Sequence, residues 1–125
     1  MKLSIPKGCD NAPKKDFLVN INMAYTRRDL TALREAFTDK FAWNCLETQK
    51  IVSKDDLNES IFMDSPIRAL CLEKVLTHGR EGAVMGKMTC ENGIIYAFSE
   101  FYEFSGAKGD KVKSITRFIV PLNHG

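Results

Sequence analysis

The sequence lacks the features that would place it in several common protein classes. It has no apolar run approaching ~20 residues, so nothing in it predicts a membrane-spanning helix. Its lysines and arginines are scattered, and its formal net charge of +2 is too small to favour nucleic-acid binding. We therefore expect neither a membrane nor a nucleic acid as a partner.

Metal-binding and phosphate-binding patterns are also missing. The cysteines and histidines are Cys9, Cys45, Cys71, Cys90, His78 and His124. No Cys-x-x-Cys pair, no ligand-spaced His pair and no Gly-rich phosphate loop occurs, so we expect no metal and no nucleotide cofactor. The first six residues hold no apolar run long enough for a signal peptide, which predicts a cytoplasmic protein with reduced thiols.

What remains is the composition of an ordinary globular protein, with 44% hydrophobic and 27% charged residues in a chain of 125. That length predicts a single domain, residues 1–125, which is long enough to bury a substantial core.

The last third of the chain predicts an antiparallel meander. Alternating apolar residues favour strands over residues 81–90, 94–104 and 111–122. Asn92-Gly93 predicts a type I′ turn with two positive φ angles between the first two strands, and Gly86 predicts a bulge or bend in the first.

The first two thirds predict mainly helices. We expect helices over residues 13–28, 30–37 and 53–63, with strands over 41–46 and 67–77. Asn11 and Asp29 are the expected N-caps of the first two helices. Residues 1–13 and 47–53 are expected to be irregular, and the whole predicts an α+β protein.

A carboxylate on a predicted buried strand face needs an explanation. Glu100 lies between Phe98 and Tyr102 at the inward spacing, and Arg117 has the inward parity on the final strand. Two states are open: burial keeps Glu100 as a neutral acid, or Arg117 keeps it ionised in a buried ion pair. The third interpretation is that Glu100 and Arg117 form a purely structural pair that fills the space enclosed by the sheet.

The order of elements resembles the nuclear transport factor 2-like superfamily, which includes ketosteroid isomerases, scytalone dehydratase and SnoaL-like polyketide cyclases. The resemblance rests on residues 25–30, 37–44, 98–104 and 115–119, and it covers nearly the whole chain. It implies a cone-shaped α+β barrel, in which a strongly curved, mostly antiparallel sheet wraps around the N-terminal helices. This fold hosts many activities, so it does not define a function.

The resemblance assigns candidate site positions. It places Asn44 where ketosteroid isomerases carry their base, and Ile21 where they carry an oxyanion-hole tyrosine. An amide cannot act as the base, so isomerase activity of that kind is not expected. Glu100 matches the second oxyanion donor and is the catalytic candidate. The ligand-binding candidates are Asn44, Arg117, Tyr102, Ile21 and Tyr25.

Two functions follow as hypotheses. The first is a protein that binds a small apolar or cyclic molecule in an apolar cone pocket, with a SnoaL-like lyase or isomerase as its enzymatic form. The alternative is a non-catalytic dimeric interaction module with a filled cone. A homodimer is expected because apolar residues also have the outward parity; these are Ile95, Ala97, Phe101 and Phe118. A solvent-reachable cavity that touches Glu100 would favour the first hypothesis.

Overall fold

The computed structural model of the protein describes residues 2–6 and 12–122. Its elements are β1 (Lys2–Ser4), α1 (Pro13–Thr26), α2 (Leu30–Ala36), β2 (Phe37–Cys45), β3 (Lys50–Ser53), η1 (Lys54–Asp56), η2 (Glu59–Ile61), β4 (Ile67–His78), β5 (Glu81–Cys90), β6 (Ile95–Phe104) and β7 (Val112–Pro121). The two η elements are single-turn 3₁₀ helices.

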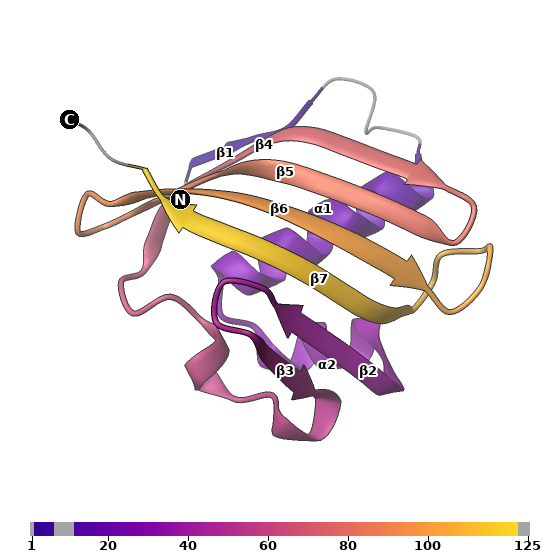
Figure 1. Ribbon diagram of the computed structural model, residues 1–125. Helices are drawn as coiled ribbons and strands as arrows, with labels where there is room; N and C mark the ends of the chain where they lie inside the picture. The colour runs from indigo at the N-terminus through magenta and orange to yellow at the C-terminus, as the bar shows by residue number, and fades with distance from the viewer. Residues whose placement is uncertain (1, 7–11, 123–125) are drawn as a thin grey trace.

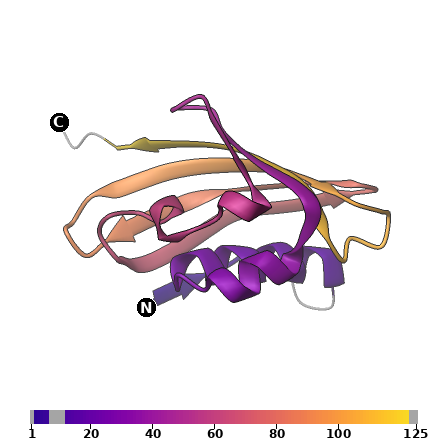
Figure 2. The ribbon, with the colours of Figure 1, turned by 90° about the horizontal axis from the view of Figure 1, so that it is seen from below.

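The strands form one mixed sheet in the order β1-β4-β5-β6-β7-β2-β3. The pairs β1–β4 and β2–β7 are parallel, and the remaining pairs are antiparallel. The sheet is strongly curved, and both α-helices lie on its concave side (Figures 1 and 2). The expected α+β cone is confirmed, although the sheet is open and its described strands do not close into a barrel.

The core fills the concave side of the sheet. Helix α1 turns Leu18, Ile21 and Tyr25 inward at helical spacing, where they meet apolar residues from the strands. Asp29 caps α2 as expected, because its carboxylate accepts a hydrogen bond of 3.1 Å from the Ala32 amide. The other expected cap, Asn11, lies outside the described residues.

The expected helix over residues 53–63 is wrong. The chain instead forms strand β3 and then η1 and η2. Ser53 directly precedes η1, but its hydroxyl accepts no backbone amide and instead donates to the Asp56 carboxylate at 3.0 Å. Val52 pairs with Trp43, so the backbone of residues 50–53 satisfies its hydrogen bonds by extending the sheet beyond β2. Residues 2–4 are likewise a short strand rather than irregular chain.

The turn between β5 and β6 is not the expected type I′. Among the residues of this turn only Gly93 has a positive φ, of 91°. The Gly93 amide donates to the Cys90 carbonyl at 2.9 Å, and the Asn92 carboxamide accepts from the Ile94 amide at 3.0 Å. Asn92 therefore keeps an ordinary conformation, and the turn is a three-residue loop with glycine at its left-handed position.

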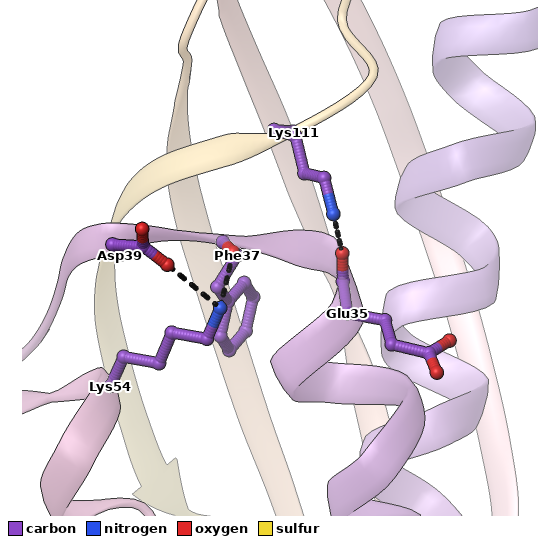
Figure 3. A network of polar contacts seen from close by, with 5 residues as sticks. All are labelled: Glu35, Phe37, Asp39, Lys54 and Lys111. Atoms are coloured by element: carbon purple, nitrogen blue, oxygen red, sulfur yellow. Dashed lines mark hydrogen bonds and ion pairs between the residues drawn. The ribbon is translucent and has the colours of Figure 1, made fainter.

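Two lysines fix the point where α2 passes into β2 (Figure 3). Lys111 donates to the Glu35 carbonyl, and Lys54 donates to the Phe37 carbonyl at 3.0 Å. Lys54 also lies 3.7 Å from the exposed Asp39 carboxylate. Cationic side chains on the last carbonyls of a helix complement its dipole. They hold the start of β2, the strand that carries Trp43 and Cys45 into the interior.

The bend in the sheet depends on close backbone packing at Gly86. The register of β4 against β5 shifts between Leu72 and Lys74, opposite this glycine. A Cβ atom at Gly86 would lie 2.2 Å from the Cys71 carbonyl oxygen. The expected bend at Gly86 therefore coincides with a bulge whose extra residue is in β4.

We predict that Gly86→Ala lowers the free energy of unfolding by about 1–3 kcal/mol, because the methyl group meets backbone that can yield only by distorting the bulge. Urea unfolding monitored by circular dichroism measures the effect. Gly106→Ala is the matched control, since nothing lies within 4 Å of its added Cβ. Equal stability of the two variants would contradict this account of the bend.

Candidate functional site

A cavity of about 270 Å³ opens where β2 and β3 turn away from the rest of the sheet. Its walls come from β2, β3, β7, η2 and the turn between β2 and β3. The lining residues are Trp43, Cys45, Glu47, Thr48, Lys50, Val52, Ser60, Ile61 and Arg117. We call this space the Arg117 cavity, because Arg117 is the buried charged residue in its wall.

Strand register sets three chemically active side chains in one row across the sheet. Cys45 on β2 pairs with Arg117 on β7, and Arg117 pairs with Glu100 on β6. Arg117 is 6% exposed and Glu100 is 4% exposed, whereas Cys45 is half-buried. The row therefore runs from the cavity, through Arg117, into the closed interior. The expected inward placement of Glu100 and Arg117 agrees with this burial.

Arg117 is held by aromatic rings. Its guanidinium carbon lies 4.7 Å from the ring centroid of Tyr25 and 5.2 Å from that of Trp43, so both rings face the cation. The Tyr25 hydroxyl donates to the Ile61 carbonyl at 2.9 Å, which fixes that ring against η2. The rings stabilise the positive charge without neutralising it.

One nitrogen of Arg117 and one of Trp43 have no hydrogen-bond partner among the described residues. These atoms are Nε of Arg117 and Nε1 of Trp43, and both are buried. Within the same residues no carboxylate lies within 4.0 Å of the guanidinium. Leaving a buried donor unpaired costs about 1–3 kcal/mol. The wall of the Arg117 cavity thus contains a buried cation that has no carboxylate partner among the described residues.

Glu100 belongs to a separate hydrogen-bonded chain in the deeper interior. The Tyr102 hydroxyl donates to Glu100 Oε1 at 2.7 Å, and the Asn22 amide donates to the Tyr102 hydroxyl at 3.1 Å and to the Leu18 carbonyl at 2.9 Å. This chain links β6 to α1. Asn22 was not among the predicted site residues. Its polar side chain, one turn from Leu18 on the apolar face of α1, was the signal that could have identified it.

Burial dominates the acidity of this chain. It raises the pKa of Glu100, although Arg117 and the hydrogen bonds from Tyr102 and Asn22 act in the opposite direction. Burial and the neighbouring Glu100 also raise the pKa of Tyr102 well above its ordinary value. Of the two expected states, a direct ion pair with Arg117 is not formed, because no carboxylate of the described residues lies within 4.0 Å of the Arg117 guanidinium.

The other predicted site residues are divided between two faces. Tyr25 lies against Arg117, and Ile21 is buried in the core beside the same helix face. Asn44 lies on the opposite face of β2 from Trp43, where its amide donates to Thr116 Oγ1 at 3.4 Å. Trp43, Cys45 and Lys50 line the cavity but were not predicted to do so. The sequence-based prediction placed Asn44 on the site face of β2, whereas Trp43 and Cys45 lie on the other face.

The cavity does not reach Glu100, because Arg117 separates them in the row and Glu100 is not among the lining residues. The described residues hold no group of three or more His, Cys, Asp or Glu side chains that could bind a metal ion. His124 and Cys9 lie outside these residues. No helix in the described part of the chain is long and apolar enough to cross a membrane.

No family model matches the sequence, and no curated protein matches it. Solved structures do match the fold. An NTF2-like protein of unknown function from Burkholderia xenovorans aligns over 94% of this chain and 91% of its own, with TM-score 0.73 and 12% identity. A candidate ketosteroid isomerase from Kribbella flavida aligns over 90% and 81%, with TM-score 0.70 and 13% identity.

A candidate SnoaL-like polyketide cyclase from Shewanella denitrificans aligns over 88% of this chain and 92% of its own, with TM-score 0.70 and 8% identity. Identities this low carry information about the fold alone. The resemblance seen in the sequence is confirmed at that level. The chain has the nuclear transport factor 2-like α+β cone fold.

Proposed function

We propose that this protein binds a small organic molecule in the Arg117 cavity. The observation that carries the proposal is the buried Arg117, which has no carboxylate partner within 4.0 Å among the described residues and lies in the wall of a cavity of about 270 Å³. Buried polar groups are nearly always paired, and the exceptions need an explanation such as a missing ligand. The volume lies just below the usual range for ligand sites, about 300–1,000 Å³, which favours a small molecule.

Binding is better supported than catalysis by Glu100. A general acid must come within hydrogen-bonding reach of the reacting group. Arg117 lies between Glu100 and the cavity in the row, and Asn44 is on the other face of β2. A SnoaL-like lyase or isomerase reaction would need Arg117 to move aside, so the function we propose is that of a binding protein.

A ligand site of this kind is expected to cost stability. Burying ionisable side chains without a direct partner is unfavourable, and proteins retain such groups where function needs them. A purely structural pair would give the opposite result, because each partner would then stabilise the fold. The stability of a Glu100 variant as a function of pH separates these roles.

We predict that Glu100→Gln is more stable than the wild type at neutral pH and equally stable at acidic pH. The pKa of Glu100 is raised in the folded protein, so the folded state binds more protons than the unfolded state. Wild-type stability therefore falls as the pH rises from the ordinary value of 4.5 through the raised pKa. Glutamine keeps the acceptor for Tyr102 and removes this dependence.

Urea unfolding at a series of pH values measures the difference between the two proteins. Glu91→Gln is the control, because Glu91 is exposed and takes part in no ion pair among the described residues, so this variant removes the same charge at the surface. If Glu100→Gln were less stable than the wild type at neutral pH, Glu100 would be a stabilising structural carboxylate and our proposal would lose its energetic support.

Val52 and Ile51 allow a matched test of the site itself. Val52 lines the Arg117 cavity, whereas its neighbour Ile51 is exposed on the other face of β3. We predict that Val52→Phe abolishes binding of fragment-library hits because the larger ring fills the cavity, and that Ile51→Phe leaves it intact. Ligand-detected NMR measures both. Equal binding by the two variants would place the site elsewhere.

A second function rests on the outer face of the sheet. Phe101 is 65% exposed and Phe118 is 45% exposed, and Leu76 and Met85 are exposed beside them. Cross-strand pairing makes these residues one patch over β4–β7. Because exposed apolar patches of this kind mark interaction surfaces, we propose that a second copy of the chain covers it.

We predict that the wild type is a dimer by light scattering at tens of micromolar, and that Phe101→Glu is a monomer because it places a charge in the apolar interface. Ile94→Glu is the control, since Ile94 is exposed in the hairpin loop between β5 and β6. A monomeric wild type would rule out this interface. The dimer and the ligand cavity use opposite faces, so each can be tested without the other.

A further inference from the structure

We propose that the Arg117 cavity takes an organic anion, and that Glu100 takes up one proton when the anion binds. This inference rests on the proposed function and adds the class of ligand and its coupling to pH. It follows from the order of charges in the row that joins the cavity to the interior.

The wall of the cavity has the charge and geometry for an anionic head group. Arg117 contributes a buried cation, and Lys50 adds a second positive charge at the rim, against one carboxylate from Glu47. The planar guanidinium matches a carboxylate or sulfonate with paired hydrogen bonds. Tyr25 and Trp43 lie on neighbouring sides of the guanidinium, because their ring centroids are only 5.8 Å apart, so the rings do not enclose it.

The burial of Arg117 gives the anion its advantage over a neutral ligand. A charge interaction is several-fold stronger at a partly buried site than in bulk water. A neutral ligand would satisfy a donor but leave the buried charge unbalanced. A cation would meet both Arg117 and Lys50. The site should therefore discriminate by charge among ligands of the same size.

Glu100 responds because it lies on the other side of the same guanidinium. Arg117 is the charged group that lowers the pKa of Glu100 in the free protein. A bound anion would share the charge of Arg117 and repel the Glu100 carboxylate. The unfavourable arrangement of two negative charges around one cation is relieved when Glu100 gains a proton from the solvent.

The groups packed around Glu100 do not offer a better site for that proton. Arg117 from β7 and Tyr102 from β6 act on it directly, while Tyr25 from α1 and Cys45 from β2 feel its charge. Asn22 from α1 is neutral, and Val84 faces it from β5. Protonated Glu100 keeps one carboxyl oxygen as the acceptor for Tyr102, so the chain to α1 survives.

Isothermal titration calorimetry with benzenesulfonate tests the inference, because this probe stays charged throughout the accessible pH range. Benzenesulfonamide is the neutral control of nearly the same shape. We expect the wild type to prefer the anion by about tenfold or more, which corresponds to about 1.4 kcal/mol. Titrations in two buffers with different ionisation enthalpies should show proton uptake of up to one per anion, and the affinity should rise as the pH falls.

Two variants assign these effects to residues. Glu100→Gln should bind the anion without proton uptake and with little pH dependence, while Arg117→Met should lose the preference for the anion. Ile51→Phe is the matched control and should behave as the wild type does, because Ile51 lies outside the cavity.

The failures are distinguishable. Equal affinity for the anion and the amide, or anion binding without proton uptake in the wild type, would overturn the inference and leave the proposed function standing. The wild type could also bind other fragments, in a way that Val52→Phe abolishes, and fail to bind the sulfonate. That result would likewise overturn the inference and leave the proposed function standing. If no small molecule binds the wild type in either experiment, both the inference and the proposed function are wrong.

Discussion

The site exists because β2 pairs with β7, and β7 with β6, in a fixed register. This register sets Cys45, Arg117 and Glu100 in one row on the concave side of the sheet. A slip of one residue in either pair would move these side chains to the outer face and bring apolar neighbours inward. The row links an open cavity to a closed interior, so a charge at one end can influence a proton at the other.

The protein keeps this row at an energetic cost. Arg117 is stabilised by the faces of Tyr25 and Trp43 but has a buried donor without a partner, and burial raises the pKa of Glu100. For a chain of 125 residues, such terms are a large part of the net stability. Such unfavourable burial is expected at a binding site, where a ligand supplies the partner that the protein itself lacks. Because of this polar row, the interior of the cone is neither an empty apolar pocket nor a purely apolar core.

Local patterns in the sequence were sufficient for the meander and for the inward face of its strands. Residues 81–90 form the predicted strand, and Glu100 and Arg117 are buried as alternation requires. The predictions fail where contacts between segments distant in the sequence determine the structure. Strand β3 forms because β2 offers an edge, and the position of Asn44 depends on the parallel pairing of β2 with β7, which no local period reveals. Likewise, the cavity arises where β3 and η2 pack beside β2 and β7, a long-range arrangement that no local pattern in the sequence reveals.

NMR can follow the titration of the Glu100 carboxyl carbon in the ligand-free protein, and its midpoint distinguishes a desolvated acid from an ion-paired carboxylate. Our account predicts a midpoint above the ordinary value of 4.5, because burial outweighs the attraction of Arg117. It also predicts a further rise in Arg117→Met, where that attraction is gone. A midpoint below 4.5 in the wild type would show that Glu100 and Arg117 form a tight ion pair, which would contradict a guanidinium available to a ligand.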